Sequence, residues 1–274
     1  MLGEASARLA TVSESPAIDA QVLLCFLMGW STTQLMLAET EIPAPGIRQD
    51  FFVLVHRRAA GEPVAYITGY REFWSHSFRV SPHTLIPRAD TETLVSRALE
   101  LVSAADSLCI LDLGCGSGNI AISIALERPG CRVTGIDIST GALEIARQNA
   151  ENLGCENVQF LRANWFDFAQ SKNFDLIVGN PPYIADGDAH LEQGDLPAEP
   201  ISALTSGPDG LDDIRRIVAD AADHLNPRGH LILEHGFDQG ARVRTLFSRA
   251  GFEDVTSHRD LGGIERISEG RRPG

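Results

Sequence analysis

The fold of this chain is indicated most directly by one stretch, Leu108-Cys109-Ile110-Leu111-Asp112-Leu113-Gly114-Cys115-Gly116-Ser117-Gly118. Its first residues have the apolar pattern of a buried strand, and the glycines that follow predict a tight turn. The apolar run from Ile120 to Leu126 then predicts a helix. A strand, a glycine-rich turn and a helix in this order form the usual site for a nucleotide-type ligand. The spacing G-x-G-x-G departs from the dinucleotide fingerprint, because Asn119 stands where that pattern needs a small residue.

A second strand is predicted at residues 131–136, and it ends at Asp137. Asp137 follows Gly118 by nineteen residues, which is close to the position where nucleotide-binding folds place an acidic side chain that accepts hydrogen bonds from the ribose hydroxyls. The alternative is that Asp137 caps the next helix, but Ser139 can provide that cap unaided. Asp137 is therefore the strongest candidate for ligand binding after the glycines.

Strands and helices continue to alternate along the rest of the chain. Strands are predicted at 158–161, 174–179 and 229–234, helices at 142–149, 211–225 and 239–250, and a last pair of strands from residue 252. This alternation predicts an α/β fold with an open, mostly parallel sheet and helices on both faces. Residues 199–210 are rich in Pro, Gly and Asp, so we expect a surface loop that borders the site.

A rigid polar turn follows the strand at 174–179 without a gap, at Asn180-Pro181-Pro182-Tyr183. A residue that precedes a proline avoids the α region, so Asn180 and Pro181 should both be extended. Because proline has no N–H, the turn offers mainly acceptors, namely the Asn180 side-chain oxygen and backbone carbonyls. Such acceptors suit a planar NH2 group held against the face of Tyr183. That geometry is the one required for attack by an amide or exocyclic amine nitrogen.

The first part of the chain has a different pattern. Residues 1–70 carry apolar residues at helical spacing and no reactive constellation, which predicts a small helical bundle. Residues 71–87 alternate loosely between apolar and polar, which predicts a β-hairpin linking the bundle to residues 88–274. The apolar periodicity that begins at Leu94 predicts a helix capped by Asp90 or Thr91.

Composition and charge narrow the function classes. A hydrophobic content of 43% and a charged content of 22% are typical of globular proteins, and the longest apolar stretch, Val22 to Trp30, is too short to span a bilayer. The net charge of −14 makes a nucleic-acid substrate unfavourable. Residues 1–15 lack the apolar core of a secretory signal, and the five cysteines are an odd number without a C-x-x-C pair. We therefore expect reduced thiols, a cytoplasmic location and no metal.

Four motifs carry a resemblance to a known family. They are Leu85-Ile86-Pro87-Arg88-Ala89-Asp90-Thr91-Glu92, Asp112-Leu113-Gly114-Cys115-Gly116-Ser117-Gly118, Asn180-Pro181-Pro182-Tyr183 and Glu234-His235-Gly236. Together they resemble the release-factor glutamine N5-methyltransferases along nearly the whole chain. The resemblance implies a class I methyltransferase-like fold at residues 88–274, with S-adenosylmethionine as methyl donor. The acceptor would be the glutamine of the Gly-Gly-Gln motif of class 1 peptide chain release factors, docked by the bundle at residues 1–70. We also expect a monomer.

The resemblance also implies roles for individual residues. The catalytic residues would be Asn180, Pro181 and Tyr183, and the substrate would be held by Asn180, Pro181, Pro182 and Tyr183. The cofactor would be bound by Gly114, Cys115, Gly116, Ser117, Gly118, Asp137, Trp165 and Asn180. The glycines would let the backbone approach the amino-acid part of the cofactor, with helix N–H groups facing its carboxylate. Trp165 would cover the adenine face.

The sequence departs from the family pattern at two positions. Asn164 stands where an acidic residue is usual, which leaves recognition of the adenine amino group open, and Ile264 stands where a polar residue is common. Arg88 lies in a motif that is near the cofactor in the family, but its residue type alone assigns it no chemical role. Two other functions remain open. One is an N-methyltransferase acting on an exocyclic base amine of rRNA or DNA, and the other is a non-catalytic S-adenosylmethionine-binding scaffold.

Overall fold

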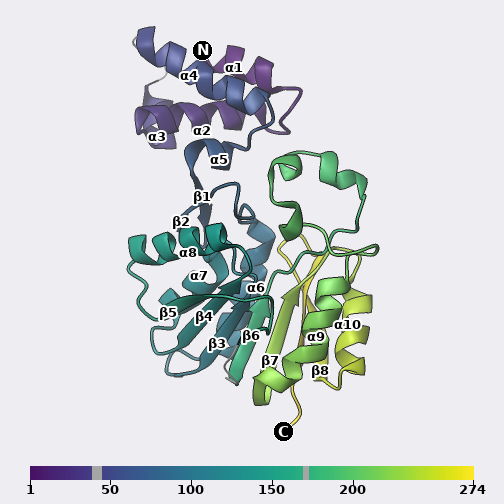
Figure 1. The fold of residues 1–274 in the computed structure, drawn as a ribbon. Coiled ribbons are helices and arrows are strands. Elements are labelled where there is room, and N and C mark those ends of the chain that lie inside the picture. Colours follow the sequence, from purple (N-terminus) through teal and green to yellow (C-terminus); the bar gives the residue numbers. More distant parts are fainter. Residues whose placement is uncertain (39–44, 169–172) are drawn as a thin grey trace. The chain divides into compact units, whose positions relative to one another are not determined.

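The computed structural model describes residues 1–38, 45–168 and 173–274. The chain forms two compact units (Figure 1). One consists of Met1–Tyr70 together with Ala189–Glu199, and the other of Arg71–Asp188 together with Pro200–Gly274. Segment 189–199, which the sequence-based division kept with residues 88–274, is thus grouped with the N-terminal helices.

The N-terminal unit is helical. Its helices are α1 (Leu2–Leu9), α2 (Pro16–Met28), α3 (Thr32–Leu37), α4 (Pro45–Ala59) and α5 (Val64–Thr68), and segment 189–199 adds the short 3-10 turns η2 (Ala189–Glu192) and η3 (Leu196–Ala198). Helix α3 begins with a capping box, in which Ser31 and Gln34 satisfy each other's backbone N–H groups. The core of the unit contains Ala5, Leu9, Ala20, Leu23, Leu24, Phe51, Val55 and Ile67.

A buried arginine ties segment 189–199 to these helices. Arg58 in α4 is only 5% exposed. Its Nε donates to Asp19 Oδ2 at 2.8 Å, and its Nη1 donates to Asp195 Oδ1 at 2.8 Å. Two acidic side chains from different parts of the chain therefore share one buried cation, and Asp195 is held to α2 and α4 through it.

The second unit contains a two-stranded hairpin and a central sheet. The hairpin consists of β1 (Tyr70–Phe73) and β2 (His76–Arg79), and its turn residues Trp74 and Ser75 have φ of 51° and 58°. The central sheet is formed by β3 (Cys109–Leu113), β4 (Arg132–Asp137), β5 (Val158–Arg162), β6 (Phe174–Gly179), β7 (Leu225–Glu234), β8 (Glu253–Arg259) and β9 (Glu265–Arg271). Among the described residues the strand order is β5-β4-β3-β6-β7-β9-β8, in which β9 pairs antiparallel with β7 and β8 and the other neighbouring pairs are parallel. The predicted open, mostly parallel sheet is confirmed.

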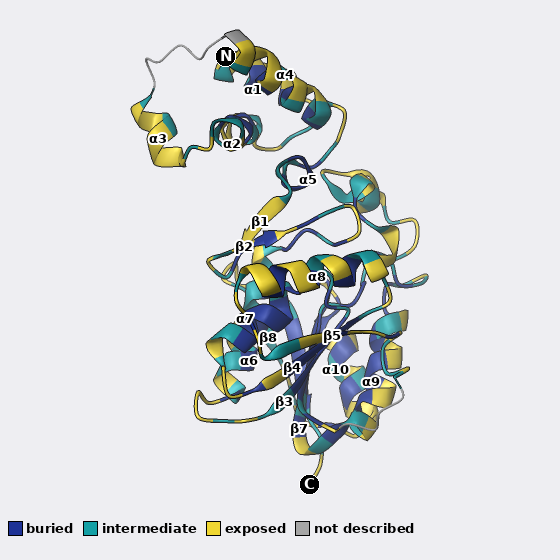
Figure 2. Ribbon diagram, turned by 60° about the vertical axis from the view of Figure 1, so that its left-hand side comes forward, coloured by how far each residue is buried: buried dark blue, intermediate teal, exposed yellow. Residues whose placement is uncertain are grey.

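Helices cover both faces of this sheet, because alternate strand residues point to opposite sides. The helices are α6 (Glu92–Leu101), α7 (Asn119–Glu127), α8 (Thr140–Asn152), α9 (Asp212–His224) and α10 (Gly240–Arg249). One core joins α6, α7 and α8 to strand residues such as Ile110 and Val178, and the other joins α9 and α10 to Leu111 and Ile177. Figure 2 shows the central strands buried, while the outer faces of α8 and α9 are exposed.

The two predicted caps have different outcomes. Ser139 caps α8 as expected, since its Oγ accepts from the Ala142 N–H at 3.2 Å. The prediction that Asp90 or Thr91 caps α6 was wrong. A 3-10 turn, η1 (Ala89–Thr91), precedes the helix, and Thr91 has helical dihedrals and makes no capping bond. The Asp90 carboxylate instead pairs with Arg266 at 2.9 Å.

The strand register places three chain segments at one edge of the sheet. Leu113 at the end of β3 is the partner of Ile136 in β4 and of Gly179 in β6. A Cβ at Gly179 would lie 3.1 Å from the Leu113 carbonyl oxygen, so glycine permits the close approach of these strands. The residues after β3, β4 and β6 therefore meet where the strand order reverses, which is where open α/β sheets bind ligands.

No helix within residues 1–38, 45–168 or 173–274 is long and apolar enough to cross a membrane.

The buried arginine generates a stability prediction. Arg58→Met keeps much of the side-chain volume but leaves Asp19 and Asp195 without their shared cation. We expect the free energy of unfolding of the helical unit to fall by about 3 kcal/mol, as for other buried ion pairs that lose one partner. Denaturant unfolding measures this loss, and hydrogen exchange should show faster exchange in segment 189–199.

Arg57→Met is the matched control. Arg57 pairs with Glu62, but its side chain is 41% exposed. Exposed pairs contribute less than about 1 kcal/mol, so this variant should be nearly as stable as the wild type. Equal losses in the two variants would mean that Arg58 is no anchor.

Candidate active site

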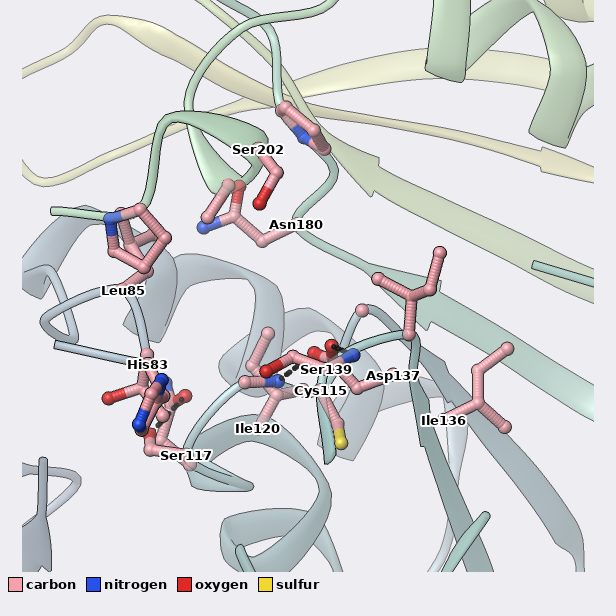
Figure 3. A pocket seen from close by; sticks show the side chains of 18 of the residues that line it. His83, Leu85, Cys115, Ser117, Ile120, Ile136, Asp137, Ser139, Asn180 and Ser202 are labelled. Atoms are coloured by element: carbon pink, nitrogen blue, oxygen red, sulfur yellow. Dashed lines mark hydrogen bonds between the residues drawn. The ribbon is translucent and has the colours of Figure 1, made fainter. Parts of the chain in front are cut away.

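A cavity of about 480 Å³ opens at the carboxyl edge of the sheet in the second unit. Its volume is in the range of pockets that bind cofactors and other small ligands. It is lined by Pro82, His83, Thr84, Leu85, Pro87, Arg88, Thr91, Gly114, Cys115, Gly116, Ser117, Asn119, Ile120, Ile136, Asp137, Ile138, Ser139, Ala163, Asn164, Trp165, Asn180, Pro182, Pro200, Ser202, Ala203 and Asp213. Figure 3 shows Asn180 and Ser202 on one side of it, across from Cys115, Asp137 and Ser139.

The glycine-rich loop after β3 forms one wall. Gly114, Gly116 and Gly118 have φ of 70°, 53° and 81°, a region that side chains disfavour. A Cβ at Gly118 would lie 2.9 Å from the Ile122 side chain and 3.1 Å from Phe160, so this glycine permits packing inside the unit. A Cβ at Gly116 would meet nothing within 4 Å. Gly116 therefore leaves room for a ligand to approach the backbone, directly before α7 begins at Asn119.

Asp137 holds this loop in place. Its Oδ2 accepts from the Gly116 N–H at 2.9 Å, and its Oδ1 accepts from the Ser139 N–H at 2.8 Å. Burial raises the pKa of the carboxyl group, and the backbone hydrogen bonds oppose that rise. The Ile138 N–H is a third backbone donor to this carboxylate, which still has acceptor capacity left for a hydroxyl group.

Trp165 and Asn164 follow β5 at the same edge. The Trp165 Nε1 donates to Asp213 Oδ1 at 3.0 Å, which fixes the indole beside Gly114. Asn164 also lines the cavity, and its Oδ1 accepts from Arg216 at 3.2 Å. The flat indole of Trp165 is therefore part of the cavity wall. The amide oxygen of Asn164, the residue that departs from the family pattern, accepts from the surface residue Arg216.

The turn after β6 is only partly exposed to the cavity. In the described part of the chain the lining includes Asn180 and Pro182 but neither Pro181 nor Tyr183. The Asn180 Nδ2 donates to Thr91 Oγ1 at 3.3 Å. The Tyr183 hydroxyl donates to Glu234 Oε1 at 3.3 Å, and burial raises the pKa of this phenol above its ordinary value. The polar groups of this turn are thus held by residues from η1 and β7.

Two carboxyl groups beside the site are almost fully buried. Asp112 in β3 is 0% exposed, and its Oδ2 accepts from the Ala121 N–H at 3.1 Å, which ties β3 to α7. Glu234 at the end of β7 is 1% exposed. Burial raises the pKa of Asp112 to about 7 and that of Glu234 to about 7.

Sequence reasoning missed several residues of this site. Thr91 was assigned to a helix cap, and Ser202 and Asp213 drew no attention. The loop at 199–210 was expected to border the site, and three of its residues, Pro200, Ser202 and Ala203, do line the cavity. Arg88 also lines it, in the motif to which only the family resemblance drew attention. No group of three His, Cys, Asp or Glu residues among those described is placed to hold a metal ion.

Comparisons with known proteins identify related sequences and a related fold. Residues 105–241 match the family model of a methyltransferase domain, and residues 1–69 match that of the PrmC N-terminal domain. The crystal structure of a methyltransferase from Pyrococcus furiosus covers 72% of this chain and 89% of its own, with a TM-score of 0.52 at 20% identity, which supports the fold alone.

Curated relatives match over nearly the full length. The release factor glutamine methyltransferase of Burkholderia pseudomallei is 47% identical over 275 residues, which is 98% of this chain and 96% of the relative. That of Salmonella typhimurium is 46% identical over 260 residues, which is 94% of this chain and 93% of the relative. On this similarity, and with the methyltransferase fold in place, the chain belongs to the release factor glutamine methyltransferase family.

Proposed function

We propose that this chain transfers a methyl group from S-adenosylmethionine to the side-chain amide nitrogen, N5, of the glutamine in the Gly-Gly-Gln motif of class 1 peptide chain release factors. One observation carries the proposal. Asn180, which directly follows β6, lines the same cavity as the glycine-rich loop and Asp137. The side chain proposed to bind the substrate amide and the loop proposed to bind the nucleoside therefore face the same cavity.

The residues present fit S-adenosylmethionine. The open space at Gly116 would admit the amino-acid part of the cofactor, with N–H groups at the start of α7 facing its carboxylate. Asp137 has acceptor capacity left for the ribose hydroxyls. The fixed indole of Trp165 offers a surface for the adenine. Cys115 and Ser117 complete this wall.

Catalysis would consist mainly of orientation. Bound S-adenosylmethionine would supply an electrophilic methyl group and keep the bonding electron pair on its sulfur. A carboxamide nitrogen is a poor nucleophile, because its lone pair is delocalised into the carbonyl, so the chain must hold it in line with that methyl group. The Asn180 Oδ1 and the Pro181 carbonyl would accept the amide N–H bonds, and Pro182 would limit movement of the turn.

No strong base is needed in this scheme. The nitrogen becomes acidic once it carries the methyl group, so its proton can leave to water after attack. Tyr183 would pack on the plane of the amide. Its hydroxyl is held by Glu234, which limits rotation of the ring.

We also propose that residues 1–70 dock the release factor, that the enzyme acts as a monomer, and that it works in the cytoplasm, where its substrate takes part in translation termination. None of the residues that the structure describes in the helical unit lines the cavity. Its contribution to catalysis would therefore come through remote binding energy.

The function is tested with radiolabelled S-adenosylmethionine and separate acceptors. Purified class 1 release factor, rRNA and DNA are each incubated with the full chain, and mass spectrometry locates the methyl group. We expect methylation of the release factor at the Gly-Gly-Gln glutamine and no methylation of rRNA or DNA. Label in rRNA or DNA alone would favour the base methyltransferase, and cofactor binding without any acceptor would favour the scaffold.

Two variants should separate amide binding from cofactor binding. Asn180→Ala removes the oriented acceptor, so the single-turnover rate should fall by about 10²–10³ while cofactor affinity stays nearly unchanged. Asp137→Asn keeps an acceptor for the Gly116 N–H, but it removes the charge and replaces the acceptor of the Ser139 N–H with an NH2 group. It should weaken cofactor binding by about 1.5–3 kcal/mol, with little effect on turnover of the saturated complex.

Calorimetry and single-turnover kinetics measure the two quantities for both variants. Asn180→Ala should change turnover and not cofactor affinity, whereas Asp137→Asn should change cofactor affinity and not turnover. Each variant is therefore the control for the other. A large loss of cofactor affinity in Asn180→Ala with normal turnover would exclude its role as amide acceptor, and unchanged affinity in Asp137→Asn would reduce Asp137 to a loop support.

Deleting residues 1–70 tests the docking role. We expect cofactor binding to persist and efficient methylation of the intact release factor to be lost, because remote contacts position the target glutamine. A short glutamine peptide should be a poor substrate for both forms. Because segment 189–199 clusters with the deleted helices, a second truncation should also replace that segment with a Gly/Ser linker.

Thermal unfolding and cofactor titration must first show that each truncated chain is folded. A folded truncation that methylates the intact release factor as efficiently as the full chain would exclude residues 1–70 as the docking unit.

A further inference from the structure

A buried polar chain stands behind the Asn180 turn. The Asn180 Nδ2 donates to the hydroxyl oxygen of Thr91, a residue that is 2% exposed. Hydrogen bonding from Thr91 and from Tyr183 lowers the pKa of Glu234, which burial alone would raise further. Asn180 with Thr91 and Tyr183 with Glu234 are thus two hydrogen-bonded pairs, and the effect of Thr91 on the Glu234 pKa links them into one group from the turn after β6, η1 and β7.

The chain has a direction that is set by its charged end. A carboxylate accepts hydrogen bonds and donates none, so the Thr91 hydroxyl is oriented as a donor toward Glu234 while Glu234 is ionised. The lone pairs of that hydroxyl are then available to the Asn180 NH2 group, as observed. With one N–H of its NH2 group engaged by Thr91, Asn180 keeps its amide oxygen as the acceptor for a ligand.

We propose that Thr91 and Glu234 are positioning residues which fix the direction of the Asn180 amide and thereby select a neutral amide over a carboxylate in the substrate. The inference rests on the proposed function. An amide oxygen accepts from the NH2 group of glutamine and repels the carboxylate of glutamate. A reversed Asn180 would present NH2 instead, which would favour glutamate and hold the reacting nitrogen poorly.

The backbone of the turn is held separately from this group. Gly179 is the partner of Leu233 in the sheet, so Asn180 and Glu234 follow neighbouring positions. The Gln239 Nε2 donates to the Tyr183 carbonyl at 2.8 Å. Because the main chain has its own support, substitution of Thr91 should change the direction of the Asn180 side chain and leave the turn in place.

The test compares Thr91→Val, Thr91→Ser and Thr93→Val. Valine has nearly the shape of threonine and no hydroxyl, serine restores the hydroxyl, and Thr93 lines a different cavity from Thr91. The substrates are full-length release factor and its Gly-Gly-Glu variant, which serves as a competitive inhibitor. Single-turnover rate, cofactor affinity and the ratio of affinities for the two release factors are measured with the full chain.

Thr91→Val should lower the single-turnover rate about tenfold, as expected for loss of one buried hydrogen bond, and should reduce the preference for the Gln form over the Glu form. Thr91→Ser should restore both, and Thr93→Val should match the wild type. Cofactor affinity should be unchanged in all three.

A second test compares the pH dependence of the single-turnover rate in the wild type and in Glu234→Gln. The charged and titratable groups that act on Glu234 are Asp90 of η1, Arg266 of β9 and Tyr183 after β6. Burial raises the pKa of Glu234 to about 7, so the wild-type rate should fall as pH decreases through that value and the carboxylate is lost. The pH profile of the Glu234→Gln variant should not show this ionisation.

Three results would overturn the inference while leaving the proposed function intact, provided that the wild type methylates the release factor. They are a Thr91→Val variant with wild-type rate and preference, equal losses in Thr91→Val and Thr91→Ser with unchanged preference, or an unaltered pH profile in Glu234→Gln. If the wild type methylates no release factor, the proposed function itself fails first.

Discussion

Parallel pairing between β3 and β6 is the constraint on which the rest of the site depends. The glycine-rich loop follows β3 and the Asn180 turn follows β6. The first is proposed to bind the cofactor and the second the substrate amide, so methyl transfer would need both segments. Because Leu113 and Gly179 are partners in register, the two segments emerge side by side from the same edge of the sheet. A slip of one residue would turn the apolar side chains of β6 toward the wrong core, so the hydrophobic packing that stabilises the sheet also fixes the geometry of the site.

The strands that flank β6 have different tasks. β3 and its neighbour β4 supply the ligand loop and Asp137, whereas β7 supplies Glu234 on the other side. Asp137 and Glu234 lie at strand ends, where backbone N–H groups and hydroxyl groups are available to donate hydrogen bonds to their carboxyl oxygens. Even so, Asp112 Oδ1 and Glu234 Oε2 are buried without a hydrogen-bond partner among the described residues. Their raised pKa values follow from that burial, and they mark where the fold accepts unfavourable solvation next to the site.

The sequence was sufficient for those features that depend on local pattern. Strand and helix alternation predicted the sheet, and the glycine turn, Asp137 and Asn180 were found because their residue types are unusual directly after an apolar run. Features that depend on tertiary contacts were not accessible. Thr91 looked like a cap because its position before α6 is the usual one for a capping residue, but the 3-10 turn gives it helical dihedrals and frees its hydroxyl for Asn180. Likewise, no pattern in residues 189–199 indicates that Asp195 pairs with Arg58, since the two residues lie 137 positions apart in the chain.

The polar turn alone does not identify the acceptor, and the structure explains why. A carboxamide and an exocyclic base amine both present a planar NH2 group, and both would bind the same pair of oxygen acceptors at Asn180 and Pro181. Discrimination between them must come from features outside the turn. The net charge of −14 disfavours a phosphate backbone, and we propose that the separate helical unit docks the protein substrate. Within the turn, we propose that the direction of the Asn180 amide distinguishes a group that donates hydrogen bonds from one that only accepts them. On the proposed scheme, surfaces remote from the chemistry would select the class of substrate, and the oriented Asn180 side chain would select a neutral amide over a carboxylate.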